Sequence, residues 1–140
     1  MTITSTQRNA SGAPNFASGM FKDTGTVKKT ILNLGFVLRY FKLIDTAGTE
    51  LSFELFAGMA GADGWKTAND GTLTFETSAM PEFIENFDST TVDTWTVYDA
   101  TAGSETDSSR LNLVNEVFTG VSIPAALVPS SSQMYWFAIG

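Results

Sequence analysis

Apolar residues alternate with polar ones along several short stretches of this chain. In residues 50–57, Leu51, Phe53 and Leu55 alternate with polar positions, and residues 72–78 repeat the pattern. Alternation with a period of two is typical of a strand that buries one face. Similar stretches recur about every 8–12 residues between turn signals, which predicts an all-β fold: an antiparallel sandwich, a jelly-roll-like fold or a small barrel.

Two stretches depart from simple alternation, because both of their strand faces are apolar. They are residues 36–45 and the C-terminal "MYWFAI". A strand of this kind is either central to a core or part of an interface between subunits, and we favour the interface interpretation. The residues predicted to form the core and the subunit contacts are Phe36, Leu38, Tyr40, Phe41, Tyr135, Trp136 and Phe137.

The first 26 residues have a different composition from the rest of the chain. Residues 1–26 are mostly small and polar, which predicts an extended N-terminal arm, and residues 27–140 are predicted to form a single β domain. Phe16, Met20 and Phe21 would anchor the arm if it docks onto another protein. A frayed end without a docking role is the alternative.

Three other segments contain proline or glycine residues that are unusual in a central β-strand. Pro81 followed by acidic residues predicts at most a short helix near residues 81–87. The Gly- and Asp-rich residues 58–71 are interpreted as a loop. Residues 120–132 contain two prolines and are interpreted as an edge strand followed by a loop.

Length and composition limit the possible functions. The 140 residues suggest one domain, and a hydrophobic fraction of 43% with 16% charged residues is typical of a globular protein. Cys and His are both missing, which excludes disulfides, thiolate metal sites and His-based catalysis. No apolar run approaches the ~18 residues of a membrane span, and the N-terminus lacks the apolar stretch of a secretion signal. We therefore expect no membrane partner and synthesis in a cytoplasm.

Charge is distributed unevenly along the chain. Residues 1–66 hold seven Lys/Arg and five Asp/Glu, whereas residues 67–140 hold one Arg and ten Asp/Glu. Nucleic acid is not expected as a partner, because binding to phosphates needs a basic face. The acidic half either serves solubility or faces water while the more neutral half docks.

No arrangement of residues specifies catalysis or a cofactor. Carboxylate pairs of the kind that glycosidases use can be formed by Glu82 with Glu85, by Asp88 with Asp93, and by Asp99 with Glu105 or Asp107. Such pairs are expected by chance in an acidic chain. Oxygen-rich stretches at residues 85–93 and 105–109 are conceivable calcium ligands, but neither fits an EF-hand loop. We expect a protein without enzymatic activity, cofactor or metal.

Residues 24–45, "TGTVKKTILNLGFVLRYFKLID", and 53–60, "FELFAGMA", resemble small structural proteins of tailed-bacteriophage particles. In that group a Thr-Gly-Thr leads into a strand, a Gly-Phe-x-Pro-Arg-x-Val strand follows, and an aromatic-acidic strand ends in Gly-Met-Ala. The positions that match are Gly35, Phe36, Arg39, Phe53, Glu54, Phe56, Gly58, Met59 and Ala60. Leu38, Phe41 and Leu55 replace the Pro, Val and Trp that are usual there.

The resemblance implies a β-rich accessory protein of the particle, of the capsid decoration (cement) type. Such a protein would bind the outer capsid surface as a homo-oligomer, with the major capsid protein as partner and a homotrimer closed head to tail as the expected assembly. Its location would be the capsid surface of the virion. A head-fibre or tail component that binds a receptor or carbohydrate is the alternative.

Overall fold

The predicted all-β class is confirmed. The structure, a computed structural model, shows two β-sheets that form an open sandwich and do not close into a barrel. All strand pairings of the described residues are antiparallel except that of β3 with β9. The described residues are 3–7, 15–22, 29–46, 50–88, 96–99, 108–109, 117–128 and 133–140.

The larger sheet has seven strands and the smaller sheet has five. In spatial order, the larger sheet consists of β1 (Ile3–Gln7), β2 (Phe16–Lys22), β12 (Gln133–Ile139), β4 (Tyr40–Asp45), β5 (Glu50–Phe56), β6 (Gly64–Ala68) and β7 (Leu73–Glu76). The smaller sheet consists of β10 (Ser108–Ser109), β9 (Thr96–Asp99), β3 (Thr30–Asn33), β11 (Val117–Ile123) and β8 (Glu82–Asp88). A short 3-10 helix, Ala125–Leu127, follows β11.

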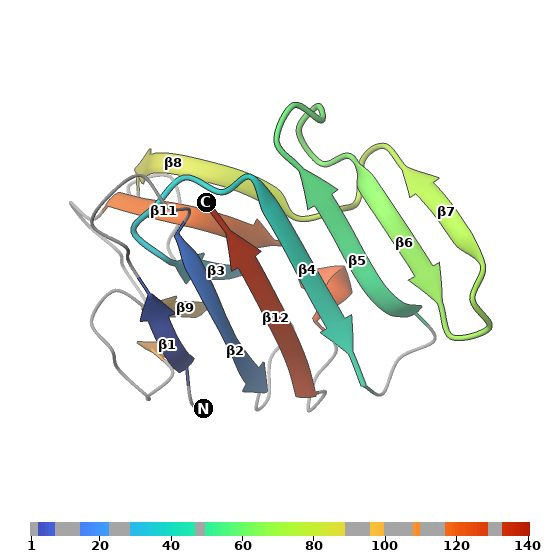
Figure 1. Ribbon diagram of the computed structural model, residues 1–140, viewed down its shortest axis with the longest axis horizontal. Helices are drawn as coiled ribbons and strands as arrows, with labels where there is room; N and C mark the ends of the chain where they lie inside the picture. The colour runs from blue at the N-terminus through green and yellow to red at the C-terminus, as the bar shows by residue number, and fades with distance from the viewer. Residues whose placement is uncertain are drawn as a thin grey trace.

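The smaller sheet lies behind one part of the larger sheet, and its strands run across the direction of β2, β12 and β4 (Figure 1). The segment between β3 and β4 connects the smaller sheet to the larger one. It contains the buried residues Leu34, Phe36 and Leu38. β6 and β7 extend beyond the smaller sheet (Figure 1). The larger sheet is therefore covered on its inner face only over part of its width.

Strict alternation in the central strands builds the core. In β4, Phe41 and Leu43 point inward and are buried, and in β12 Met134 and Trp136 do the same. They pack in one cluster with residues of β11 and β3 from the smaller sheet. The indole ring of Trp136 fits against Gly19 of β2, where a Cβ atom would lie 3.0 Å from the ring. Trp136 therefore fills the space that a residue without a side chain leaves.

β3 is buried on both of its faces. Leu32 belongs to the main cluster between the sheets, whereas Ile31 points the other way and forms a smaller cluster with Ile84 and Phe118. Successive strand residues point to opposite faces, so this second cluster lies on the far side of the smaller sheet.

Residues 81–87, for which at most a short helix is predicted, form no helix. Glu82–Asp88 is the strand β8, which pairs along β11 with a register shift between Phe118 and Gly120. Pro81 precedes the first strand residue, a position where its missing N–H costs no ladder hydrogen bond. The pairing with β11 outweighs the helix-start signal, because that signal concerns only the local chain.

The N-terminal arm predicted over residues 1–26 is corrected over part of its length. Phe16–Lys22 is the strand β2, which pairs with β12 over seven residues and with β1 on its other side. Ser18 and Gly19 interrupt the apolar residues of this segment, and Gly19 leaves room for the indole ring of Trp136. Phe16–Lys22 is therefore an integral part of the larger sheet.

Two further strand assignments differ from the sequence interpretation. The segment interpreted as a loop over residues 58–71 contains the strand β6, and β11 lies between β3 and β8 instead of at an edge. Pro124 follows the last residue of β11, so it does not interrupt the ladder. The expected strand over residues 36–45 begins only at Tyr40.

Candidate docking surface

The outer face of the larger sheet, which points away from the smaller sheet, carries a continuous set of apolar side chains. Residues that pair across antiparallel strands share a face, so the registers align these side chains in rows. From β2 towards β7 the three rows are Phe16–Ile139–Tyr40–Phe56, Ser18–Phe137–Lys42–Glu54–Trp65–Phe75 and Met20–Tyr135–Ile44–Ser52–Thr67–Leu73. The name "outer face" refers to these sixteen residues.

Aromatic rings connect four strands of the outer face. The ring centroids of Phe16 and Phe137 are 4.8 Å apart, those of Tyr40 and Phe137 6.1 Å, and those of Tyr40 and Phe56 5.4 Å. The first two pairs meet edge to face, the geometry that the ring quadrupoles favour. The rings therefore hold one another in place before any partner binds.

The hairpin of β6 and β7 reverses the usual distribution of polarity. On the side that would face a core, Lys66 Nζ lies 3.0 Å from Glu76 Oε1. On the outer face, Trp65 and Phe75 pack edge to face with their ring centroids 5.0 Å apart. A hairpin that only covered the core would bury its rings inward, so its apolar side indicates contact with something outside the subunit.

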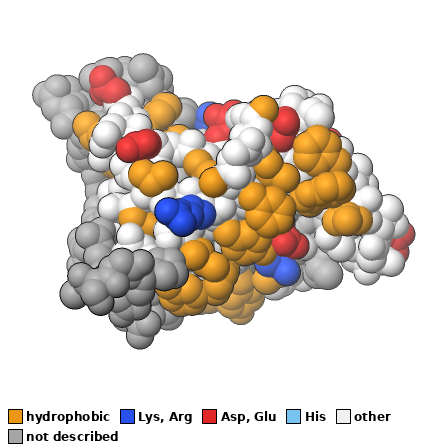
Figure 2. Space-filling view, turned by 45° about the horizontal axis from the view of Figure 1, so that its top comes forward, with side chains coloured by type: hydrophobic (Ala, Val, Ile, Leu, Met, Phe, Trp, Pro, Cys, Tyr) orange, Lys and Arg blue, Asp and Glu red, His pale blue; other side chains and the backbone are white. Residues whose placement is uncertain are grey.

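Most of the exposed large hydrophobic side chains lie on the outer face. Of the six in the described part of the chain, four are outer-face residues: Phe56 (41% exposed), Leu73 (59%), Phe75 (45%) and Tyr135 (42%). Figure 2 shows hydrophobic side chains gathered in a band that continues toward the side where Figure 1 places β6 and β7. Contiguous apolar patches of this kind mark interaction sites on soluble proteins.

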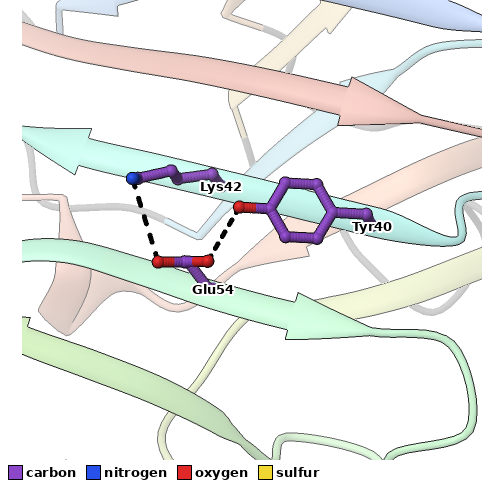
Figure 3. A network of polar contacts seen from close by, with 3 residues as sticks. All are labelled: Tyr40, Lys42 and Glu54. Carbon is purple, nitrogen blue, oxygen red and sulfur yellow. Dashed lines mark hydrogen bonds and ion pairs between the residues drawn. The ribbon is translucent and has the colours of Figure 1, made fainter. Parts of the chain in front are cut away.

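Eleven of the sixteen outer-face residues are apolar or aromatic, and the other five are Ser18, Lys42, Ser52, Glu54 and Thr67. Near the centre of the face, Tyr40, Lys42 and Glu54 form a connected polar network. The hydroxyl of Tyr40 donates a hydrogen bond to Glu54 Oε2 at 2.8 Å, and Lys42 Nζ lies 3.8 Å from Glu54 Oε1 (Figure 3). Burial, followed by the hydrogen bond and the negative charge of Glu54, raises the pKa of Tyr40 from 10.0 to about 12. A partly exposed ion pair contributes little to stability. Its main effect here is to fix three side chains near the centre of the outer face.

The titration of Tyr40 gives a direct test of this arrangement. Because its folded-state pKa lies above the usual value, its contribution to stability is fully present below pH 10 and is lost as the pH rises towards 12. We expect the phenolate absorbance to contain a late-titrating component, and Tyr40→Phe to remove that component. Glu54→Gln should lower the pKa of Tyr40 without restoring it to 10, because burial remains. A late component that persists in Tyr40→Phe would contradict the assignment.

The residues predicted for the core and subunit contacts divide between the two faces. Four are buried inside the subunit: Phe36, Leu38, Phe41 and Trp136. Three lie on the outer face: Tyr40, Tyr135 and Phe137. The four buried residues belong to the core part of the combined prediction, and a side chain buried within the subunit has no surface to offer a partner.

The three predicted arm anchors divide in the same way. Phe21 is wholly buried in the main core cluster, so it is corrected as a capsid anchor. Phe16 and Met20 lie on the outer face, at its β2 edge. Deleting residues 1–26 would remove β1 and β2, the two strands at one edge of the larger sheet, together with the buried Phe21, so such a deletion tests folding and not docking.

Sequence reasoning missed Phe56, Leu73 and Phe75 as surface residues. Exposure of Trp65 or Trp95 is expected from the sequence only under the carbohydrate- or receptor-binding alternative. The alternation in residues 72–78 identified a strand with one apolar face, but it gave no indication of which way that face points. The pairing of Trp65 with Phe75 settles the direction, and that pairing depends on β6, which had been interpreted as a loop.

The carboxylate candidates do not form a cluster in the described residues. Glu82 and Glu85 lie on β8 and are both exposed, and Asp88 is at its end. No group of three or more potential metal ligands is found in the described ranges. Asp93, Glu105, Asp107 and most of both conceivable calcium stretches lie outside them.

A small pocket lies between the turn after β5 and the start of β8. Its volume is about 210 Å³, and its walls include Met59, Pro81 and Phe83. This is below the roughly 300–1,000 Å³ of typical small-molecule sites. The outer face is the larger and more coherent candidate.

Comparison of the chain with family models, with curated proteins and with solved structures gives no match. Within the described ranges, no helix has the length and hydropathy needed to cross a bilayer.

Proposed function

We propose that this chain is a non-enzymatic structural protein of a bacteriophage particle, a capsid decoration protein that binds the outer capsid surface as a homo-oligomer. The observation that carries the proposal is the apolar outer face, whose rings are preorganised and partly exposed on a fully formed sandwich. A subunit with an exposed apolar face of this kind functions by binding to the surface of another protein subunit. The proposed partners are the major capsid protein and further copies of the chain.

The resemblance at residues 24–45 and 53–60 supports the phage assignment. The second of these stretches has a clear place in the fold, since Phe53 points into the core while Glu54 and Phe56 lie on the outer face. The matching residues therefore include both the scaffold and the proposed docking surface. Arg39, another matching residue, is exposed in the segment that leads into β4.

Copy number in the particle tests the proposal. Phage particles from cultures that produce this protein are purified by density gradient, and the protein is quantified by mass spectrometry against the major capsid protein. We expect a fixed ratio with many copies per particle, and binding of the purified protein to empty capsids. Absence from purified particles would contradict the proposal, and a few copies located on the tail would contradict the decoration role.

A carbohydrate- or receptor-binding role on a head fibre or tail is the second candidate. The Trp65–Phe75 pair favours it, because partly exposed aromatic rings offer a surface on which sugar rings stack. Quenching of tryptophan fluorescence by glycans, lost in Trp65→Ala, would support this role. The same quenching in Trp65→Ala would place glycan binding elsewhere. Trp95, also expected to be exposed in this role, lies outside the described residues.

A further inference from the structure

We propose that the outer face packs against the outer face of a second copy of this chain, about a two-fold axis that runs parallel to the strands between β4 and β5. The inference deepens the proposed function and rests on it for the biological role of the pair. It identifies the building block of the homo-oligomer as an isologous dimer.

The order of the strands places this axis at the centre of the outer face. Six strands carry the outer-face residues, and the boundary between β4 and β5 has three on each side: β2, β12 and β4, then β5, β6 and β7. Rotation about an axis at this boundary places each strand opposite its counterpart from the other half. β4 then faces β5 of the second copy, and β12 faces β6.

The side chains that meet in this arrangement are complementary. Lys42 on β4 faces Glu54 on β5 of the second copy, and Glu54 faces the second Lys42, so four alternating charges surround the axis. In the adjacent row, Tyr40 faces Phe56 of the second copy. In the row that contains Lys42 and Glu54, but farther from the axis, Phe137 on β12 faces Trp65 on β6 of the second copy. Opposite charges near the centre fix the register of two otherwise apolar faces.

The flatness of a sheet face argues against a three-fold arrangement of the outer face. Three flat faces turned toward a common axis contact one another only in a strip near that axis, whereas two faces related by a two-fold axis stack over their whole area. Both the homotrimer expected from the resemblance and the contact with the capsid would therefore have to use other surfaces.

The size of the outer face is sufficient for a specific dimer. Six strands spaced ~4.8 Å apart, each contributing four to seven residues, cover roughly 550–600 Å² per subunit. Two such faces bury roughly 1,100–1,200 Å², above the ~1,000 Å² expected of a specific interface. Packed sheets lie about 10 Å apart, so side chains of this size fill the space between them.

A second copy also suits the outer face better than a lipid surface. Lys42 is the single basic residue among the sixteen outer-face residues, and it is paired with Glu54. The whole chain carries a net charge of −7. Adsorption to anionic lipid needs a basic cluster, which the sixteen outer-face residues named above do not provide.

Analytical ultracentrifugation of the full chain tests the dimer. At about 100 μM, well above the micromolar dissociation constants of the weakest interfaces of standard size, we expect a species of twice the 15.1 kDa chain mass. Tyr135→Lys and Phe56→Lys each place a new charge on the outer face at a side chain that is already partly exposed. We expect each to raise the dissociation constant at least roughly tenfold. Circular dichroism checks that both variants remain folded.

Two matched variants complete the experiment. Val117→Lys adds the same charge at an exposed position of the smaller sheet, and we expect its dimer to be unchanged. The charge exchange Lys42→Glu with Glu54→Lys should preserve the dimer, whereas Lys42→Glu alone should weaken it. A monomer or a trimer in the wild type, or a dimer that survives both outer-face lysines, would overturn the inference.

These outcomes are separable from the test of the phage role. A monomer that is nonetheless abundant on particles would overturn the dimer and leave the decoration role intact. A dimer that is absent from particles would support the dimer and overturn the decoration role.

Discussion

Replacing Gly120 by Ala is expected to destabilise the protein by about 4 kcal/mol or more, a large part of the ~5–15 kcal/mol that holds a typical domain folded. Gly120 lies on β11 at the register shift opposite β8, where its φ of +156° and its neighbours leave no room for a side chain. A Cβ atom would lie 2.1 Å from the carbonyl oxygen of Leu32 and 3.1 Å from the amide nitrogen of Leu34. Both are backbone atoms, so relief requires β3 and β11 to separate.

Gly71→Ala is the matched control for this substitution. Gly71 also has a positive φ, +89°, but a Cβ atom there would meet nothing within 4 Å. Its cost is therefore backbone strain alone, about 1–2 kcal/mol. Thermal melts followed by circular dichroism should place Gly120→Ala roughly 10 °C or more below Gly71→Ala. Equal melting temperatures would mean that β3 and β11 do not approach each other as closely as described.

The fold class could be predicted from the sequence because it depends on local alternation. β5 and β7 were visible as strands from the spacing of Phe53, Leu55 and Phe75. The pairing of the C-terminal strand was also predictable, since water-exposed Trp136 would lose the benefit of burial. These features need no knowledge of what the strands pair with.

The elements that sequence reasoning misassigned depend on partners distant in the chain. β8 is a strand because β11 lies beside it, although Pro81 gives a helix-start signal. β2 is a strand because β12 pairs along its whole length, although Gly19 lowers the strand propensity of this segment. Tertiary pairing overrides local propensity in both cases.

The two-sided apolar pattern of residues 36–45 has a structural explanation. From Tyr40 onward, one parity provides Phe41 and Leu43 to the core, and the other provides Tyr40 and Ile44 to the outer face. The sequence shows that both sets of residues are apolar, but it does not show which set faces the core, because either set is apolar enough to be buried. The register with β12 and β5 decides which set faces the smaller sheet.

Protection of the outer face in the assembled protein is the second large effect expected. Hydroxyl radicals label exposed aromatic and aliphatic side chains, and Phe56, Phe75 and Leu73 are all open to solvent in the single subunit. If a second copy covers them, their labelling should fall several-fold on assembly, because side chains at the core of an interface are fully desolvated. Val117 provides an internal reference, since it is equally exposed but lies on the smaller sheet.

The decisive measurement is therefore radical footprinting of the wild-type protein beside the Tyr135→Lys variant at the same concentration. We expect Phe56, Phe75 and Leu73 to be protected in the wild type and labelled in the variant, with Val117 labelled equally in both. Equal labelling of the outer-face residues in both proteins, at a concentration where ultracentrifugation finds an oligomer, would show that the subunits associate through another surface.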